Sequence, residues 1–252
     1  MPQSFSITDK GLRREMNQDF IFSSDIPLGE LSCLYLVADG MGGHQAGEYA
    51  SKYTVETVAE VVGGGALPKG TGAEKILAEA FRAANARIRH DSARYRELYG
   101  MGTTLVACTV EGDTLVAANV GDSRLYVFHG GRLRQVTVDH SLVEEMVRAG
   151  TLEREYARTH PERNVITRAV GVEDELRVDF FRVPLSECGI VLMCSDGLTT
   201  MLEDSEIEDI LQRDITLEQK AGILVSRANR AGGKDNISVI LIDTSPLTGA
   251  AE

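Results

Sequence analysis

Five aspartates of this sequence lie at the ends of short apolar runs that have the length and composition of β-strands. They are Asp19 in "NQDF", Asp39 in "LVADG", Asp122 in "NVGDSR", Asp196 in "LMCSDG" and Asp235 in "GGKDNIS". Taken singly, an Asp-Gly pair after a strand favours a hairpin turn. That interpretation fits poorly here, because no alternating strand pattern follows either Asp-Gly pair. The carboxylates therefore need another role, and a fold that gathers these strand ends gives them one.

Carboxylates that are brought together repel one another, and several could not stay ionised without cations. Ligation by oxygen atoms alone favours Mg²⁺ or Mn²⁺ over zinc, which prefers histidine and cysteine. Gly40 follows Asp39, and a residue without a side chain lets its backbone carbonyl approach a metal closely. The Asp39-Gly40 pair is therefore predicted to supply two oxygen ligands. The net charge of -12 agrees with cation binding and argues against a nucleic-acid surface, which needs basic patches.

Length and composition favour one cytoplasmic domain. A chain of 252 residues with 43% hydrophobic and 25% charged residues can bury one large core without disulfides. The four cysteines lie singly inside apolar runs without CxxC spacing, which predicts buried, reduced thiols in a reducing compartment. No run approaches the roughly 20 apolar residues of a membrane helix, and the first residues lack the apolar centre of a signal peptide. We therefore expect no membrane association.

The order of apolar patterns predicts a mixture of helices and antiparallel strands. Strands are expected at 5–7, 20–22, 33–38, 175–183, 189–197 and 236–243, and helices at 46–62, about 73–95, 204–211 and 217–228. Residues 102–136 are predicted to form a four-strand meander with hairpin turns at 111–113, 121–122 and 130–131. Residues 141–171 are polar and irregular around one short helix, which predicts a surface flap.

Eight motifs follow one another along the chain: "RREMNQD", "VADGMGGHQAGEYAS", "GTTLVA", "NVGDSRLY", "DHSLVEEMVRAG", "NVITRAVG", "LMCSDGL" and "KDNISV". Together they resemble the ordered motifs of the metal-dependent protein phosphatases, the type 2C serine/threonine (PPM) family, in its bacterial form. The resemblance implies an α+β fold of four layers, α-β-β-α, in which two central antiparallel sheets are flanked by helices. It also implies one phosphatase domain over residues 1–252, with its core at about 5–243 and the flap at about 141–171.

The resemblance further implies roles for the aspartates whose positions match the motifs. Asp39 would bridge two metal ions, and Asp122 would hold a third ion together with Asp196. The expected cofactor is therefore Mn²⁺ or Mg²⁺, with two ions in the core site and a third beside them. The implied ligands, direct or through water, are Asp19, Asp39, the Gly40 carbonyl, Asp122, Asp196 and Asp235.

Arg14, five residues before Asp19, matches the phosphate-binding arginine of the family, and its planar fork suits two phosphate oxygens. In the implied mechanism, two metals lower the pKa of a bridging water, and the resulting hydroxide attacks phosphorus in line. No covalent phosphoenzyme is expected, because no cysteine has an arginine six positions later and no DxDxT motif occurs.

Two positions depart from the wider family. Met41 stands where many eukaryotic members carry a histidine proposed as general acid, and His44, typical of bacterial members, is the candidate replacement. The alternative for His44 is a structural hydrogen bond at a helix entrance. Gln18 stands where an acidic residue is often found, and it is expected to hydrogen-bond a metal-bound water. Asn236 either starts the last strand or supports the metal shell beside Asp235, and we favour the second interpretation.

The segment "DHS" at Asp139, His140 and Ser141 contains the residue types of a hydrolase triad. Sequence neighbours cannot readily converge as nucleophile, base and orienting group. A turn and a helix cap are therefore expected at this segment.

The leading hypothesis is a cytoplasmic, monomeric phosphatase of phosphoserine and phosphothreonine proteins that opposes a bacterial serine/threonine kinase. One alternative is a catalytically silent family member that only binds phosphoproteins. Such a protein would normally have lost metal aspartates, and all five remain here. A structural calcium-binding β protein would need ligands spaced within one loop, as in DxDxDG, and this pattern is absent from the sequence.

Overall fold

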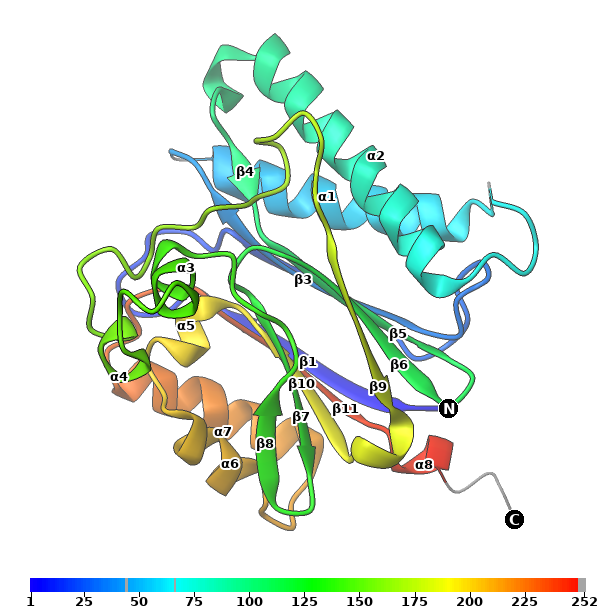
Figure 1. Cartoon of the computed structure of the whole chain (residues 1–252), viewed down its shortest axis with the longest axis vertical. Coiled ribbons are helices and arrows are strands. Elements are labelled where there is room, and N and C mark those ends of the chain that lie inside the picture. The colour runs from blue at the N-terminus through cyan, green and yellow to red at the C-terminus, as the bar shows by residue number, and fades with distance from the viewer. Residues whose placement is uncertain (44, 66, 249–252) are drawn as a thin grey trace.

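Two β-sheets lie face to face between two groups of helices (Figure 1). The structure, a computed structural model, describes residues 1–43, 45–65 and 67–248. The strands are β1 (Gln3–Asp9), β2 (Asp19–Ser24), β3 (Leu34–Met41), β4 (Gly102–Thr103), β5 (Leu105–Glu111), β6 (Thr114–Val120), β7 (Arg124–His129), β8 (Arg132–Gln135), β9 (Asp179–Pro184), β10 (Ile190–Cys194) and β11 (Ile237–Asp243). The helices are α1 (Ala46–Gly63), α2 (Ala73–Arg94), α3 (Leu142–Arg148), α4 (Arg154–Ala157), α5 (Asp196–Thr199), α6 (Asp204–Leu211), α7 (Leu217–Arg230) and α8 (Ser245–Thr248).

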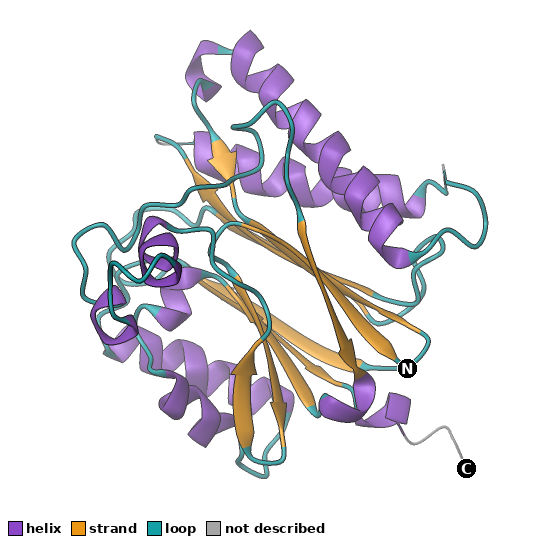
Figure 2. Cartoon of the chain, viewed as in Figure 1, coloured by secondary structure: helices purple, strands orange, loops and turns teal. Residues whose placement is uncertain are grey.

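The strands form two antiparallel sheets, which Figure 2 shows in orange. One sheet has the strand order β1-β11-β10-β7-β8. The other has the order β2-β3-β5-β6-β9, and β4 pairs with β3. Strands from opposite ends of the sequence are neighbours, because Gln3 pairs with Asp243 and Asp9 pairs with Ile237. The first strand is therefore held in place by the last.

Strand β3 has apolar residues on both faces of its sheet, and helices cover one of these faces. Its apolar residues alternate between the two faces, as a strand period of two requires. Leu34, Leu36 and Ala38 pack in the layer with α1 and α2, whereas Tyr35 and Val37 pack against the other sheet. Both faces of β3 are therefore buried in the interior.

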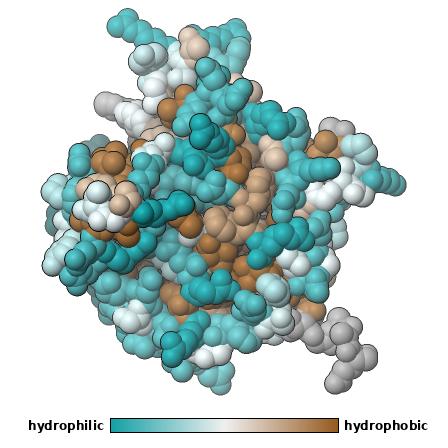
Figure 3. Space-filling model, in the orientation of Figure 1, coloured by the Kyte–Doolittle hydropathy of each residue, from teal (hydrophilic) through white to brown (hydrophobic). Residues whose placement is uncertain are grey.

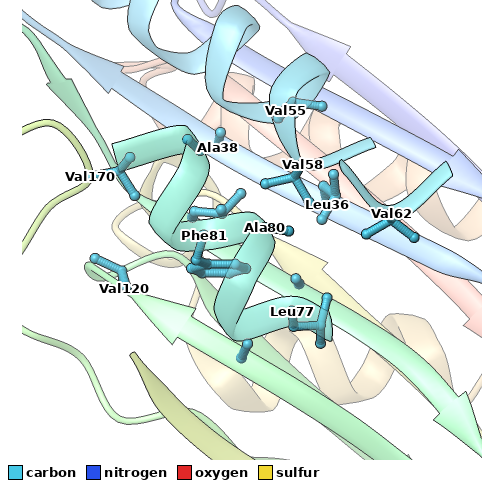
Figure 4. Packing of buried hydrophobic residues seen from close by; sticks show 14 of the residues in the cluster. Leu36, Ala38, Val55, Val58, Val62, Leu77, Ala80, Phe81, Val120 and Val170 are labelled. Atoms are coloured by element: carbon cyan, nitrogen blue, oxygen red, sulfur yellow. The ribbon is translucent and has the colours of Figure 1, made fainter. Parts of the chain in front are cut away.

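The apolar layer between α1, α2 and their sheet is shown close up in Figure 4. Phe81 of α2 is fully buried in this layer, and burial of such a side chain contributes about 1.5–3 kcal/mol. The labelled side chains come from β3, both helices, the end of β6 and the segment before β9: Leu36, Ala38, Val55, Val58, Val62, Leu77, Ala80, Phe81, Val120 and Val170.

Two further apolar layers complete the core. One lies between the sheets and includes Tyr35 and Val106 from one sheet and Met193 from the other. The second lies between the β1-β11-β10-β7-β8 sheet and helices α5, α6 and α7, and includes Tyr126 and Ile207. Three apolar layers separate four layers of secondary structure, so the predicted α-β-β-α sandwich is confirmed.

The prediction of a four-strand meander over residues 102–136 was wrong at one turn. Strands β5 and β6 form a hairpin, and so do β7 and β8, but β6 pairs with β9 whereas β7 pairs with β10. The segment at Gly121 and Asp122 is therefore a crossover between the two sheets and not a hairpin turn. Leu115 of β6 and Leu125 of β7 both face the layer between the sheets. The alternation of apolar residues within each strand could not reveal that the two strands approach this layer from opposite sides.

The segment between β8 and β9 carries two short helices, α3 and α4, where the sequence predicted only one. Ser141 is the N-cap residue of α3, and its side chain accepts a hydrogen bond from the Glu144 amide. This contact confirms the helix cap expected at the "DHS" segment. A side-chain oxygen at this position satisfies a backbone N–H that the first helical turn leaves without a partner.

The surface is mostly hydrophilic on the face shown in Figure 3, with hydrophobic residues visible near its centre. The four cysteines, Cys33, Cys108, Cys188 and Cys194, are buried and free, as predicted. Among the helices in the described ranges, none combines the length and apolar character needed to cross a bilayer.

Candidate metal and phosphate site

Most of the predicted site residues line a cavity of about 240 Å³ at one end of the two sheets, whereas Asp19 is not among its lining residues. β2 begins at Asp19, which pairs in register with Asp39 of β3. Asp39 was expected at a strand end, but β3 continues to Met41 and pairs with β4. The residues of the predicted site that line the cavity are Arg14, Gln18, Asp39, Gly40, Asp122, Asp196, Asp235 and Asn236.

The aspartates reach this cavity from both sheets. Asp39 comes from β3 of one sheet, whereas Asp196 lies two residues after β10, at the start of α5, and Asp235 lies just before β11 in the other sheet. Asp122 lies in the crossover that joins the two sheets. The site therefore straddles the interface between the sheets, and the fold gathers the strand ends as the sequence indicated.

Asp19 is the most enclosed of the five aspartates, with a relative exposure of 5%. Its Oδ2 atom accepts hydrogen bonds from the hydroxyls of Ser195 and Ser238, each at 2.7 Å. Its Oδ1 atom is buried and has no hydrogen-bond partner among the described residues, and the same holds for Oδ1 of Asp196. Buried polar atoms in folded proteins are rarely left unpaired, so two orphaned carboxylate oxygens call for a ligand at this place.

Burial and mutual repulsion disfavour the charged forms of several of these carboxyl groups. Burial raises the pKa of Asp19 to about 7, and the charges of Asp196 and Asp235 add to the effect. Burial raises the pKa of Asp196 to about 6, and Asp235 again contributes. The pKa of Asp39 is raised well above its ordinary value by burial and then by the neighbouring aspartates. A cation bound among these groups would offset both the burial of the charged carboxylates and the repulsion between them.

The side chains present fit hard divalent cations. The donors around the cavity are carboxylate, amide and hydroxyl oxygens, which suit Mg²⁺ or Mn²⁺ better than zinc. Within the described residues, no group of three or more His, Cys, Asp or Glu side chains is arranged to hold a single ion. The fit therefore rests on the orphaned oxygens of Asp19 and Asp196 and on the shared burial of the carboxyl groups.

Gly40 has a steric role that the sequence interpretation missed. A Cβ atom at this position would lie 2.0 Å from the backbone oxygen of Gly47 in α1 and 2.7 Å from that of Gln18. Glycine is therefore required so that α1 can approach the strand that carries Asp39. The expectation that the Gly40 carbonyl also binds metal stays a prediction.

Hydroxyl groups that the sequence interpretation did not identify hold the backbone of Asp39. The Thr104 hydroxyl accepts a hydrogen bond from the Asp39 amide at 3.0 Å, and the Thr103 hydroxyl donates to the Asp39 carbonyl at 2.8 Å. Ser195 and Ser238 do the same for the Asp19 side chain. The available signal was the presence of serine and threonine within otherwise apolar strand sequences.

Arg14 lies at the mouth of the cavity, with its side chain 49% exposed. Its Nη2 atom donates to Oδ2 of Asp235 at 2.6 Å, and this hydrogen bond raises the pKa of Arg14.

The Asn236 side chain fixes the loop that carries Arg14. Its Oδ1 accepts from the Gln18 amide at 2.8 Å, and its Nδ2 donates to the Lys10 and Met16 carbonyls. His44, the candidate general acid, lies outside the described residues.

Comparison with known proteins identifies the family of this chain. The family described as "Protein phosphatase 2C" matches residues 12–228. The serine/threonine phosphatase stp of Listeria welshimeri is 40% identical over 239 residues, which cover 94% of this chain and 93% of that protein. The protein phosphatase PhpP of Streptococcus pneumoniae is 38% identical over 236 residues, covering 94% and 95%.

Solved structures give the same result. The serine/threonine phosphatase Stp1 from Staphylococcus aureus superposes with a TM-score of 0.89 at 34% identity and covers 96% of this chain and 95% of that one. The Mycobacterium tuberculosis phosphatase PstP/Ppp gives a TM-score of 0.84 at 33% identity, with coverage of 96% and 98%. Sequence, fold and family match agree over nearly the whole length. The chain therefore belongs to the protein phosphatase 2C family of serine/threonine protein phosphatases.

Proposed function

We propose that this phosphatase hydrolyses phosphoserine and phosphothreonine proteins with Mn²⁺ or Mg²⁺ held by its five clustered aspartates. Membership of the family implies metal dependence. The observation that carries the residue assignment is the pair of buried, orphaned oxygens on Asp19 and Asp196 among carboxyl groups that repel one another. We assign two ions to the core site around Asp39 and a third to Asp122 with Asp196.

A bound pair of divalent ions supplies Lewis acidity and a water of lowered pKa at this site. The protein's own residues then determine where the phosphate lies. Asp39 and Asp19 pair across β2 and β3, so the strand register fixes the separation of these two carboxylates. Thr103 and Thr104 hold the Asp39 backbone from both sides. Because these oxygen atoms are held in place, the charges around the phosphate do not have to rearrange during the reaction.

Arg14 is the proposed phosphate-binding group. Its guanidinium contacts Asp235 through one nitrogen, and a guanidinium has five N–H donors in a fixed fork. The ion pair with Asp235 holds the side chain over the cavity that Asp39 and Asp196 also line. The remaining donors can therefore reach the oxygens of a phosphate group placed in this cavity.

Replacing Arg14 by alanine is expected to raise KM for a phosphothreonine peptide about tenfold or more, because charge-assisted hydrogen bonds to the bound phosphate are lost. The fall in kcat should be smaller if the fork mainly holds the ground state. Steady-state kinetics at saturating Mn²⁺ measure both constants. The exposed neighbour Arg13 offers a matched control, since Arg13→Ala removes an equal charge beside the site. An unchanged KM in Arg14→Ala would make Arg14 a surface charge only.

The proposed partners are a serine/threonine kinase of the same cell and the proteins which that kinase phosphorylates. The similar proteins named above are called serine/threonine phosphatase and protein phosphatase, which supports this substrate class. We further propose a monomer that works in the cytoplasm. Four free, buried cysteines suit a reducing compartment.

The direct test is release of inorganic phosphate from a phosphothreonine peptide by the purified protein. We expect turnover with Mn²⁺ or Mg²⁺ and none after treatment with a chelator, with activity restored when the ion is added back. Turnover that survives the chelator would contradict the proposed metal site. A protein that binds phosphopeptide but releases no phosphate with either ion would instead be the catalytically silent alternative.

A further inference from the structure

His140 is a buried histidine outside the carboxylate cluster, with a relative exposure of 6%. It contacts Gly121 twice: the His140 amide donates to the Gly121 carbonyl at 2.9 Å, and the Gly121 amide donates to Nδ1 of His140 at 3.0 Å. A backbone amide can only donate, so Nδ1 carries no proton. Burial lowers the pKa of His140, which favours the neutral ring with its proton on Nε2.

The Nε2 side of the same ring faces Asp179. Nε2 lies 3.1 Å from Oδ2 of Asp179, so the ring proton is donated to this carboxylate. Arg168 donates to the other oxygen of Asp179 at 2.8 Å and lies 3.0 Å from Nε2. The Gly121 amide thus fixes the tautomer of His140: Nδ1 accepts, so the proton of the neutral ring is on Nε2 beside Asp179. The Arg168 guanidinium can only donate, so its contact with Nε2 is not a hydrogen bond in this tautomer.

Gly121 immediately precedes Asp122 in the crossover between the sheets. Its φ of 106° is a conformation that favours glycine, and a Cβ atom would lie 2.6 Å from Cβ of Thr104. On the other side of Asp122, the Ser123 hydroxyl lies 2.7 Å from that of Thr104, which accepts from the Asp39 amide. Both neighbours of Asp122 are therefore fixed, one through His140 and one through Thr104.

His140 also lies where the flap, residues 141–171, joins the sheets. Its carbonyl accepts a hydrogen bond from the Thr167 amide at 2.8 Å, and Ser141 forms an isolated bridge with Ile166. The two ends of the flap therefore meet beside His140. One residue contacts both the base of the flap and the peptide that carries Asp122.

We infer that His140 is a positioning residue: its Nδ1 atom holds the Gly121 amide and thereby aims the Asp122 carboxylate at the site that Asp196 shares. This inference rests on the proposed role of Asp122 in holding a third ion. The buried histidine of the "DHS" segment then serves the reaction without touching the phosphate or the metal ions. His140 acts through the backbone of Gly121.

Two substitutions separate this role from simple packing. His140→Asn places its Oδ1 near the position of Nδ1, so it keeps an acceptor for the Gly121 amide but loses the bond to Asp179. His140→Gln places its amide near Nε2, so it can donate to Asp179 but offers no acceptor to Gly121. Both replace a buried ring by a smaller amide, which makes each the control for the other.

We expect His140→Gln to lower kcat about tenfold at saturating Mn²⁺ and to weaken the weakest Mn²⁺ site about tenfold. His140→Asn should stay within about twofold of the wild type in both. Kinetics with a phosphothreonine peptide and Mn²⁺ binding by equilibrium dialysis give the two readouts, and Asp122→Asn provides the reference for loss of the carboxylate. Equal losses in the Asn and Gln variants, or a silent Asp122→Asn, would overturn the inference.

Wild-type protein gives a further readout that depends on no substitution. The Gly121 amide should exchange its hydrogen with solvent slowly, because it is bonded to His140. Exchange as fast as that of an exposed loop amide would overturn the inference even if a variant failed to fold. Failure of the proposed function is a different outcome, since wild-type protein would then release no phosphate with Mn²⁺ while the Gly121 amide remained protected.

Discussion

Replacing Asp39 by asparagine is expected to lower phosphopeptide turnover at least about a thousandfold, equivalent to roughly 4 kcal/mol of transition-state stabilisation. Asp39 is the proposed bridge between the two core ions, so the neutral amide removes a charge that both of them need. The same change should raise the stability of the metal-free protein. Burial and the neighbouring aspartates raise the pKa of Asp39, which means that its charged form opposes folding at neutral pH.

The Asp39→Asn substitution is therefore expected to lower turnover and to raise the thermal stability of the metal-free protein. Steady-state kinetics with Mn²⁺ should show the loss of turnover, and thermal unfolding in chelator should show a higher Tm, by about 2–4 °C for each kcal/mol in a protein of this size. Asp113→Asn is a suitable control, because Asp113 is an exposed carboxylate in the turn at the far end of β5. Near-normal turnover in Asp39→Asn would refute the assignment of Asp39.

The metal-free protein should lose stability as the pH rises from about 4 to about 7, which is the reverse of common acid denaturation. Burial raises the pKa of Asp19 to about 7 and that of Asp196 to about 6. A carboxyl group with a raised pKa keeps its proton more readily in the folded state. Its contribution is therefore fully present below the ordinary value near 4 and is lost as the pH approaches the raised value, on the order of 1.4 kcal/mol per pH unit for each group.

Thermal unfolding across this pH range, in chelator and in saturating Mg²⁺, measures the effect. Bound cations should remove the loss, because metal binding strengthens as carboxyl groups release their protons. Asp19→Asn is the matched variant, and its metal-free form should show a flatter pH dependence than the wild type. If the two metal-free proteins lose stability equally between pH 4 and pH 7, then Asp19 does not titrate as its burial requires.

Local sequence patterns predicted the elements of this fold well but did not predict every pairing. The helices expected at 46–62 and 204–211 agree closely with α1 and α6, because their apolar spacing follows the helical period. The crossover at Gly121 was missed, since the pattern of a strand states which residues are apolar but not which sheet it joins. Partner choice depends on contacts between residues far apart in the sequence.

The features of the candidate site were likewise predictable only in part. The carboxylates at strand ends were recognisable because they recur at five strand ends without a hairpin pattern after them, and four of the five, all except Asp19, line one cavity. The roles of Thr104 and Ser195 were not predictable, because each acts on a residue many positions away in the chain. The steric reason for Gly40 was equally hidden, since it depends on the approach of Gly47 in α1.

The pairing of β1 with β11 has a consequence for the protein during its synthesis on the ribosome. A nascent chain that stops before residue 235 already contains Asp19, Asp39, Asp122 and Asp196, but β1 has no neighbour beside which to form. The loop after β1, which carries Arg14, also lacks Asn236, the residue that fixes it. Partly made chains are thus expected to be inactive toward phosphoproteins, and the enzyme becomes competent only once its last strand has been translated.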